Sequence, residues 1–246
     1  MQLNEVKALI TGGVSGLGLA VARKVVAGGG QAVLLDINDE AGAAAEAELG
    51  GAVTYVRTDV TSEEGVSDAV KLAVDHMGLV NAAVNCAGII GAGRVLGREA
   101  PMALEFFSKV IQVNLVGSFN VIKAAGAAME SNPPGEDGER GVIISTASVA
   151  ATDGQIGQAA YSASKAGIVG MTLPVAREYA RIGVRVNAVA PGIFWTPMVD
   201  GMPEHIQESL SASIPFPSRL GKPEEYAELV AHIMENGYLN GETIRL

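Results

Sequence analysis

Short apolar runs recur along the chain and are separated by longer segments in which apolar and polar residues mix. Several of the runs end in glycine or in a short polar turn, which is typical of strands buried on both faces of a parallel sheet. This pattern predicts strands at 6–11, 32–36, 52–57, 82–85, 142–145, 184–190 and 242–246.

The segments between these strands predict helices. The predicted helices cover 17–27, 41–49, 62–76, 103–129, a stretch that contains Tyr161, 203–213 and 223–236. Thr61 or Ser62 can cap the third of them. The segment SNPPGEDGERG at 131–141 is too rich in proline and glycine for a helix and predicts a loop.

Strands that alternate with helices predict an α/β fold, a Rossmann-type doubly wound parallel sheet with helices on both faces. Hydrophobic residues make up 48% of the chain and charged residues 18%, which suits a sheet covered on both faces. No linker, repeat or low-complexity tract interrupts the 246 residues, so we expect a single domain over 1–246.

Charge and composition narrow the classes of partner. The net charge of −10 argues against nucleic acid or an anionic membrane as a partner. A single cysteine, Cys86, excludes an intramolecular disulfide and fits a reducing compartment. Three scattered histidines without neighbouring cysteines or acids predict no metal site.

No apolar run approaches the length of a membrane span. Only a few residues precede the first predicted strand, so we expect no secretory or transit peptide there unless one was removed beforehand. We therefore expect a soluble, cytoplasmic protein, and its acidic balance favours a bacterial source.

The segment TGGVSGLG at 11–18 joins the first predicted strand to the first predicted helix. Gly12, Gly16 and Gly18 allow a tight turn in which the backbone can approach a pyrophosphate, and the helix start offers free N–H groups. This spacing differs from the usual G-x-G-x-x-G, and an ordinary strand–helix turn is the alternative.

Asp36 ends the second predicted strand, about 20 residues past the glycines, where a carboxylate can bind both hydroxyls of an adenosine ribose. The same charge would repel a 2′-phosphate, and the neighbouring Val14 and Ile37 offer no cation for one. Asp36 therefore predicts NAD rather than NADP as the cofactor, with a solvated acid at a strand end as the alternative.

Two further segments follow strands and should face the same ligand, because ligands of such sheets lie beyond the carboxyl ends of the strands. Asp59 and Val60 follow the third strand. The segment that follows the fourth strand consists of Asn85, Cys86, Ala87 and Gly88. Cys86 has no basic neighbour in the sequence, so we interpret it as a packed residue rather than a nucleophile.

Tyr161 and Lys165 stand four residues apart in a predicted helix and should share one of its faces. A lysine charge favours ionisation of a neighbouring phenol, so the pair is suited to proton transfer. Ser148, in the segment STAS at 145–148, precedes the pair. The alternative is a surface pair without a catalytic role.

Together these motifs resemble the short-chain dehydrogenase/reductase family over essentially the whole chain. The resemblance rests on TGGVSGLG, Asp36, Asp59-Val60, NCAG at 85–88, Asn114, Ser148, YSASK at 161–165 and Pro191-Gly192. Of the five tyrosines, only Tyr161 has a lysine four residues later.

The resemblance implies a role for each catalytic candidate. Tyr161 would exchange a proton with the substrate oxygen, and Lys165 would lower the Tyr161 pKa and bind the nicotinamide ribose. Ser148 would hydrogen-bond the substrate oxygen. Asn114 would bend its helix and hold a water that links Lys165 to solvent. As alternatives, Ser148 could simply end its strand, and Asn114 could be a buried polar residue of a helix.

The resemblance also implies the cofactor contacts. They are Gly12, Ser15, Gly16, Leu17, Gly18, Asp36, Asp59, Val60, Asn85, Cys86, Ala87, Gly88, Tyr161, Lys165, Pro191, Gly192, Phe194 and Thr196.

We expect the substrate loop at about 192–213. Its apolar side chains are Phe194, Trp195 and Met198. Trp195 would contact the substrate, although such a side chain can also serve as packing. Gln155 and Gln158 precede Tyr161 and could present amides to a substrate carbonyl.

A closer likeness is to the subgroup of type-2 3-hydroxyacyl-CoA dehydrogenases, which also act on 17β-hydroxysteroids. It is carried by AVLLD, AVNCAGI, APGIFWTPM, SIPFPSRLGKPEEYAELV and the long segment from Gly141 that contains STAS and YSASK. This likeness implies NAD-dependent interconversion of 3-hydroxyacyl-CoA and 3-oxoacyl-CoA. The loop at 131–141 lies where that subgroup has its own insertion.

Three alternatives remain open. A 3-oxoacyl-carrier-protein reductase is the nearest, although Asp36 disfavours the NADPH that those enzymes usually take. A hydroxysteroid dehydrogenase is the second. The third, from another class, is an NAD-binding scaffold subunit of a complex.

The resemblance implies a homotetramer that takes a small acyl-CoA or steroid-like substrate. Relatives continue past 244–246 into a tail that contributes to subunit contacts, so the details of assembly stay open. Animal members of the subgroup are mitochondrial, which makes the mitochondrial matrix the alternative location for a eukaryotic source.

Overall fold

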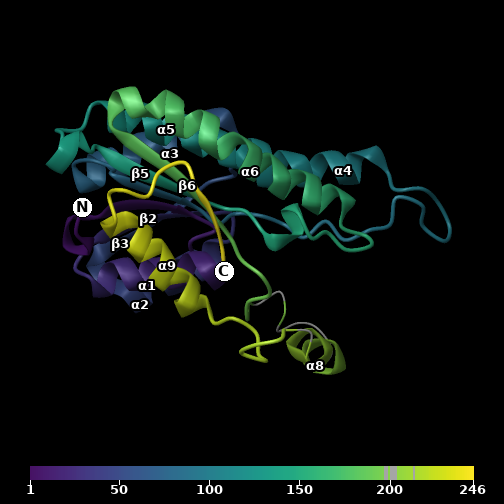
Figure 1. The fold of residues 1–246 in the computed structure, drawn as a ribbon. Helices are drawn as coiled ribbons and strands as arrows, with labels where there is room; N and C mark the ends of the chain where they lie inside the picture. The colour runs from purple at the N-terminus through teal and green to yellow at the C-terminus, as the bar shows by residue number, and fades with distance from the viewer. Residues whose placement is uncertain (197–198, 200–203, 213) are drawn as a thin grey trace.

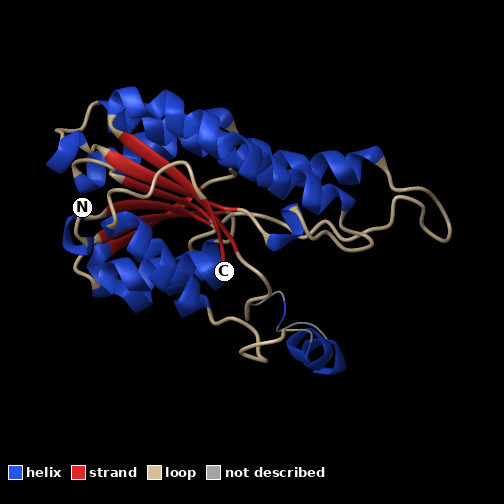
Figure 2. Cartoon of the chain, in the orientation of Figure 1, coloured by secondary structure: helices blue, strands red, loops and turns tan. Residues whose placement is uncertain are grey.

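The computed structural model describes residues 1–196, 199, 204–212 and 214–246. Its described residues form a seven-stranded sheet between two layers of helices (Figures 1 and 2). The strands are β1 Lys7–Thr11, β2 Gln31–Asp36, β3 Val53–Arg57, β4 Ala82–Asn85, β5 Gly141–Thr146, β6 Val184–Ala190 and β7 Thr243–Arg245. The predicted α/β fold class is confirmed.

Every strand pairs in parallel with its neighbour, in the order β3-β2-β1-β4-β5-β6-β7. Strands β2 and β3 lie on one side of β1, and the chain then crosses back so that β4 to β7 lie on the other side. Thr11 at the end of β1 pairs with both Leu35 and Asn85. The crevice beyond the ends of β1 and β4 is therefore the place where a sheet of this kind binds its ligand.

Helices cover both faces of the sheet (Figure 1). The lower layer of Figure 1 contains α1 Gly16–Ala27, α2 Asp39–Leu49 and α9 Pro223–Glu235. The upper layer contains α3 Glu63–Met77, α4 Leu104–Ile111, α5 Gly117–Glu130 and α6 Ala159–Tyr179. Helix α8, Glu204–Ala212, lies apart from both layers.

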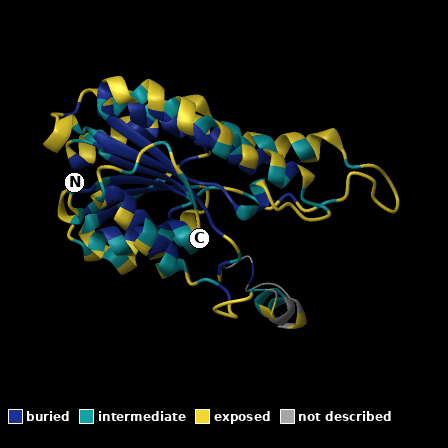
Figure 3. Ribbon diagram, in the orientation of Figure 1, coloured by how far each residue is buried: buried dark blue, intermediate teal, exposed yellow. Residues whose placement is uncertain are grey.

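Two hydrophobic cores result, one on each face. Ala8 and Ile10 point into the core under α1 and α9, whereas Leu9 between them points into the core under α3 and α5. Every residue of β5 and of β6 is buried (Figure 3). This double coverage explains why the strands appear in the sequence as unbroken apolar runs.

The predicted strands all lie where the sequence placed them, with ends that differ by a residue or so. Ser62 caps α3, because its hydroxyl accepts the N–H of Gly65 at 3.1 Å. The loop predicted at 131–141 contains one short 3-10 turn, Glu136–Gly138, and its last residue already begins β5. The predicted helix at 203–213 is described only as Glu204–Ala212, because 203 and 213 lie outside the described residues.

The helix predicted at 103–129 differs from expectation. It consists of α4, a π-helical segment η3 at Gln112–Val116, and α5. The remaining short elements are 3-10 turns: η1 Leu3–Glu5, η2 Gly50–Ala52, η4 Glu136–Gly138, η5 Val149–Ala151 and η6 Ala180–Ile182.

The expectation that no segment has the length and hydropathy of a membrane span was wrong. The continuous helical stretch Leu104–Glu130 reaches both. Half of that apolar window is buried inside the protein, where α5 packs against α3 and the sheet. Packing in the protein core thus accounts for its apolar composition.

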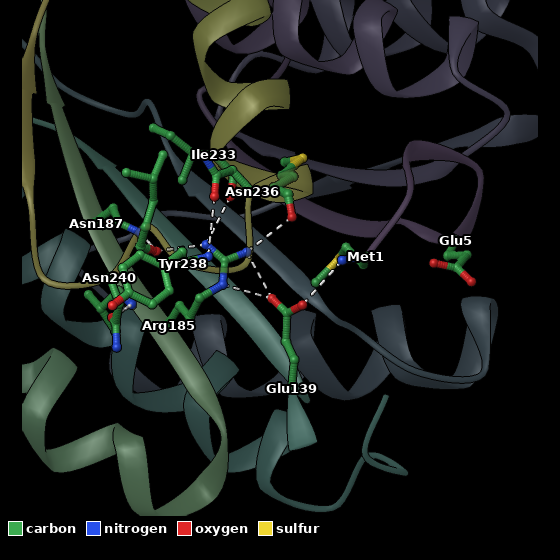
Figure 4. A network of polar contacts seen from close by, with 12 residues as sticks. Met1, Glu5, Glu139, Arg185, Asn187, Ile233, Asn236, Tyr238 and Asn240 are labelled. Carbon is green, nitrogen blue, oxygen red and sulfur yellow. Dashed lines mark hydrogen bonds and ion pairs between the residues drawn. The ribbon is translucent and has the colours of Figure 1, made fainter. Parts of the chain in front are cut away.

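The amino ends of the strands are tied together by Arg185 of β6 (Figure 4). Its buried guanidinium pairs with Glu139 at 2.8 Å, and Glu139 also accepts the Met1 amino group at 3.2 Å. The same guanidinium donates to the carbonyl oxygens of Ile233, Met234 and Leu239. This cluster joins β6, α9 and the loop before β5 at the end of the sheet opposite the crevice.

Candidate active site

The crevice beyond β5 receives the predicted catalytic residues from two elements. Strand β5 ends at Thr146, and Ser148 follows in extended conformation, where its Oγ accepts the N–H of Ala150 at 3.1 Å. Helix α6 begins at Ala159 and carries Tyr161 and Lys165 in its first turns. Ser148 and Lys165 are both buried, at 8% and 6% exposure. The structure thus brings together the three side chains that the sequence singled out.

Lys165 is a buried cation. Its Nζ donates to the Thr146 carbonyl oxygen at 2.6 Å and lies 5.7 Å from the centre of the Tyr161 ring. Burial lowers the pKa of Lys165 to about 8, since desolvation disfavours the ammonium. The side chain is therefore charged at neutral pH and close to its titration range.

Two effects shift the pKa of Tyr161 in opposite directions. Burial raises the pKa of its phenol, and a hydrogen bond with Ser148 lowers it. The net direction is upward, whereas the resemblance implies a lowered pKa. Desolvation of the phenolate outweighs the hydrogen bond in the protein itself.

Asn114 lies in the π-helical segment and is fully buried. Its Oδ1 accepts the N–H of Ile89 at 2.8 Å, and its Nδ2 donates to the Ile89 carbonyl at 3.0 Å and to Ser164 Oγ at 3.1 Å. Ser164 in turn donates to the Tyr161 carbonyl at 2.7 Å. Asn114 thus connects the segment after β4 to the helix that carries Tyr161 and Lys165. The implied bend takes the form of a π-helical turn.

The glycine positions of the turn do not accommodate side chains. Gly12 has a φ of +61° and Gly16 a φ of +49°, which favour glycine. A Cβ on Gly12 would lie 2.8 Å from the Ala87 nitrogen, and one on Gly18 would collide with the Gly12 carbonyl. Ser15 is the N-cap residue of α1, with no capping bond from its side chain. The turn is a bare backbone cradle at a helix N-terminus, which fits a pyrophosphate.

A hollow of about 380 Å³ opens beside this cradle. It is lined by Val14, Ser15, Gly16, Leu19, Arg23, Trp195, Thr196, Pro223 and Glu224. Leu17 lies partly buried against the core under α1. The hollow brings Ser15 and Gly16 of the turn to the same space as Thr196 of the predicted substrate loop.

Asp36 ends β2 and is partly exposed. Its Oδ1 accepts the backbone N–H groups of Ile37 at 2.8 Å and Asn38 at 3.2 Å, and its Oδ2 has no hydrogen bond within the residues described. The sequence reasoning did not consider Arg57, its register partner on β3. The Arg57 guanidinium donates to the Ile37 carbonyl and to Asp39, each at 2.7 Å, so a cation also lies near this acid.

The segment after β4 is held by Thr11 of β1, which the sequence reasoning missed. Thr11 Oγ1 accepts the N–H of Cys86 at 3.2 Å and of Ala87 at 3.1 Å. Asn85 donates to Ser145 Oγ at 3.1 Å. A Cβ on Gly88 would lie 3.8 Å from Lys165 Nζ, so this segment borders that lysine.

Other predicted cofactor contacts lie around the same crevice. Asp59 is exposed, and its Oδ1 accepts both the N–H and the hydroxyl of Thr61. Val60 is buried, and its carbonyl accepts Asn120 Nδ2 at 3.0 Å. Farther along the chain, the Pro191 carbonyl accepts the Val149 N–H, and the Gly192 N–H donates to Leu246.

The residues predicted at the substrate loop and before Tyr161 are only partly placed as expected. Phe194 is buried and packs edge-on against Tyr226, with ring centres 6.4 Å apart, so its side chain belongs to the core. Trp195 is 43% exposed. The Gln158 Oε1 accepts the Gln155 N–H at 2.9 Å, so that amide oxygen is engaged within its own turn. Met198 lies outside the described residues.

Within the described ranges, no group of three or more His, Cys, Asp or Glu side chains is arranged to hold a metal ion. Cys86 is also no candidate nucleophile, because burial raises the pKa of its thiol. Ser148, Tyr161 and Lys165 are thus the remaining candidates that the sequence singled out for the chemistry of this site.

Known proteins are similar to this chain in sequence and in fold. A family profile described as short chain dehydrogenase matches residues 6–207. The chain is 53% identical over 241 residues to the 3-hydroxyacyl-CoA dehydrogenase type-2 of Homo sapiens and to that of Bos taurus, covering 97% of this chain and 92% of each relative. A crystal structure of 3-hydroxyacyl-CoA dehydrogenase type-2 from Mycobacterium avium matches with a TM-score of 0.93 and 41% identity, covering 97% of this chain and 93% of that one.

These matches confirm the predicted resemblance, including its subgroup, and they extend over nearly all of the chain. We conclude that this chain belongs to the short-chain dehydrogenase family and is an oxidoreductase that acts on CH–OH groups.

Proposed function

We propose that the protein interconverts 3-hydroxyacyl-CoA and 3-oxoacyl-CoA with NAD as its cofactor. The observation that carries this proposal is the cluster at the end of β5 in which the buried Ser148 and Lys165 lie with the partly buried Tyr161. The substrate class is supported by the relatives named 3-hydroxyacyl-CoA dehydrogenase type-2, of which the chain covers 92%.

The residues present fit a dinucleotide. The turn packs so closely on Ala87 and on itself that Gly12 and Gly18 have no room for a Cβ, and a close glycine turn before a helix N-terminus is the kind of backbone that binds a pyrophosphate. When bound, NAD supplies the hydride acceptor for oxidation of the alcohol, and NADH supplies the hydride for reduction of the ketone. Lys165 would bind the nicotinamide ribose, and Thr196 would meet the nicotinamide amide.

The proton is handled by the protein's own side chains. In oxidation, Tyr161 Oη takes the proton of the substrate hydroxyl, and in reduction it returns the proton to the carbonyl oxygen. Ser148 donates a hydrogen bond to that oxygen and stabilises the charge that develops on it. Burial raises the pKa of Tyr161, and the Lys165 ammonium, 5.7 Å from the centre of its ring, would oppose that rise as the resemblance implies.

The preference for NAD over NADP is supported by Asp36. The free Oδ2 of this carboxylate is available for ribose hydroxyls, and its charge would repel a 2′-phosphate. Arg57 does not cancel this effect, because its guanidinium is already paired with Asp39.

The three alternatives make different demands. A 3-oxoacyl-carrier-protein reductase would prefer NADPH, against the charge of Asp36. A hydroxysteroid dehydrogenase would use the same Ser148, Tyr161 and Lys165, so only substrate tests separate it. An NAD-binding scaffold would not need the buried pairing of Lys165 with the Thr146 carbonyl.

We further propose a homotetramer, in line with the family, located in the cytoplasm of a bacterium. Neither nucleic acid nor an anionic membrane suits the net charge of −10. The mass in solution, measured by light scattering, decides the oligomeric state.

A substrate panel tests the proposed function. Oxidation of NADH is followed by absorbance with acetoacetyl-CoA, with an acetoacetyl carrier protein and with a 17-ketosteroid. We expect the highest kcat/KM with acetoacetyl-CoA. Turnover of the carrier-protein thioester alone would favour the reductase, and binding of NADH without any turnover would favour the scaffold.

A further inference from the structure

A hydrogen-bonded chain reaches the catalytic cluster from the opposite face of the sheet. Tyr226 of α9 is fully buried, and its hydroxyl lies 2.7 Å from Thr146 Oγ1. Thr146 Oγ1 lies 3.5 Å from Cys86 Sγ. Cys86 Sγ also lies 3.9 Å from the Tyr226 hydroxyl, so the three side chains form a closed set of contacts in which either hydroxyl can be the donor of the 2.7 Å bond.

Thr146 also carries the anchor of the catalytic lysine. Its carbonyl oxygen accepts Lys165 Nζ at 2.6 Å, and we find no other hydrogen bond of that ammonium in the parts of the chain that are described. The side chain and the carbonyl of Thr146 are therefore held at the same time, one by Tyr226 and the other by Lys165. A rotation of this last residue of β5 would break one contact or strain the other.

None of the titratable groups that face Lys165 offers a negative charge, so the stabilisation of its ammonium depends on the Thr146 carbonyl. Tyr161 lies on the same helix, Cys86 faces it from the turn after β4, and Tyr226 is linked to it through Thr146. Burial raises the pKa of all three, so none of them supplies an anion at neutral pH. The position of the Thr146 carbonyl is thus a main determinant of how well the ammonium is stabilised.

Tyr226 is itself fixed by neighbours of the site. Its ring meets Phe194 edge-on at an interplanar angle of 82°. The residue after Phe194, Trp195, donates its N–H to the Gly221 carbonyl at 2.7 Å. The phenol therefore sits between the end of β5 and the base of the predicted substrate loop.

We propose that Tyr226 is a positioning residue for the reaction, whose hydroxyl acts through Thr146 to hold the carbonyl that orients Lys165. As far as turnover is concerned, this inference rests on the proposed function. The pKa of Lys165 can be measured without any substrate, so the inference about Tyr226 and the proposed function can be refuted separately.

Tyr226→Phe tests the inference, because it removes the hydroxyl and keeps the ring. We expect kcat for acetoacetyl-CoA to fall about tenfold while KM for NADH stays within about twofold. We also expect the pKa of Lys165 to fall by about half a unit, because its ammonium loses a well-placed acceptor. Nuclear magnetic resonance of protein with 13C-labelled lysine measures this pKa, and Lys165→Met assigns the signal.

Tyr179→Phe is the matched control. It removes a phenol hydroxyl that donates to the Ile122 carbonyl at 3.2 Å, away from the site. We expect it to leave kcat and the Lys165 titration unchanged.

Two variants at Thr146 give an independent reading if Tyr226→Phe fails to fold. Thr146→Val removes the hydroxyl that bonds to Tyr226 and should reproduce the loss, whereas Thr146→Ser keeps a hydroxyl there and should retain most of the activity. Wild-type kcat together with a wild-type Lys165 titration in Tyr226→Phe or Thr146→Val would overturn the inference. A wild-type protein that leaves acetoacetyl-CoA unreduced would refute the proposed function instead, and the Lys165 titration would still decide the role of Tyr226.

Discussion

At the scale of single residues, the site contains a buried ammonium group, whose desolvation lowers the free energy of unfolding. Lys165 is 6% exposed, and its ammonium has one carbonyl for a partner among the residues described. Burial lowers its pKa to about 8 and raises that of Tyr161. Because Lys165 starts from 10.5 and Tyr161 from 10.0, the two shifts move these pKa values apart, and burial favours the uncharged form of each group.

The pKa of Lys165 predicts a pH dependence of stability. In the unfolded chain a lysine titrates near 10.4, so between about pH 8 and pH 10 the unfolded state binds more protons than the folded state. The cost of the buried charge is therefore fully present below pH 8 and is lost as pH rises. We expect the free energy of unfolding of the wild type to gain about 2 kcal/mol relative to Lys165→Met between pH 7.5 and 9.5.

Urea unfolding of both proteins across this range measures the difference. A constant difference between wild type and Lys165→Met would show that the lysine titrates normally. A decrease with rising pH would mean that its folded pKa is raised.

Asp36 predicts the choice of cofactor. Asp36→Ala removes the carboxylate and leaves the cation of Arg57, its register partner on β3, which donates to the Ile37 carbonyl. We expect the affinity for NADH to fall about tenfold or more and the discrimination against NADPH to relax, because hydrogen bonds to a charged group are lost together with its repulsion. Fluorescence titration with both nucleotides measures this. Asp68→Ala, which removes an exposed acid of α3, is the control.

The residues that local spacing defines could be predicted from the sequence. Tyr161 and Lys165 are four residues apart, and Asp36 follows the glycines by a characteristic interval. Thr11, Thr146 and Ser164 could not be predicted, because their partners are distant in the chain. Ser164, for example, meets Asn114 across 50 residues, and Thr11 meets Ala87 across 76.

At the scale of elements, the helical stretch from α4 to α5 does more than cover the sheet. Its π-helical segment at Gln112–Val116 turns Asn114 toward the segment after β4 and toward α6. The apolar pattern predicted one continuous helix at 103–129. It could not reveal the wider turn, because a π-helical turn is stabilised here by contacts made from Asn114 to other elements.

Asn114→Ala tests this connection. It leaves the Ile89 N–H and carbonyl and the Ser164 hydroxyl without their partner, so we expect a loss of stability of about 2–3 kcal/mol. We also expect kcat to fall at least tenfold, because α6 loses its link to the segment after β4.

Asn132→Ala is the matched control for the second effect. Asn132 is also buried and donates to the Val80 and Arg140 carbonyls, outside the crevice. Its substitution should lower stability and spare kcat. Equal kcat in the two variants would contradict the role of Asn114 at the site.

At the scale of the whole molecule, the two ends of the sheet serve different purposes. The carboxyl ends hold the glycine turn and the catalytic cluster, whereas Arg185 ties the amino ends together (Figure 4). The alternation of strands and helices predicted the doubly wound sheet. The strand order could not be predicted from the pattern alone, because it depends on pairings between distant segments such as β1 with β4. The Arg185 cluster could not be predicted either, because Arg185 meets Glu139 across 46 residues.

Glu139→Gln tests the purpose of the amino end. It leaves the Arg185 charge buried with only carbonyl partners and an amide, so we expect a loss of about 2–3 kcal/mol in the free energy of unfolding. Because the cluster lies away from the crevice, kcat should stay at the wild-type value. Glu130→Gln, from an exposed ion pair with Arg181, should cost less than about 1 kcal/mol. A comparable loss in both variants would show that the buried Arg185–Glu139 pair stabilises the protein no more than the exposed Arg181–Glu130 pair.

The most direct test of the central claim is the activity of Tyr161→Phe measured together with its binding of NADH. The variant keeps the ring and loses the hydroxyl that is proposed to exchange the proton with the substrate. We predict that reduction of acetoacetyl-CoA falls at least about a thousandfold, while the dissociation constant of NADH stays within about threefold of wild type. Turnover above a few per cent of wild type, with NADH bound normally, would contradict the assignment of Tyr161 as the acid and base of this enzyme.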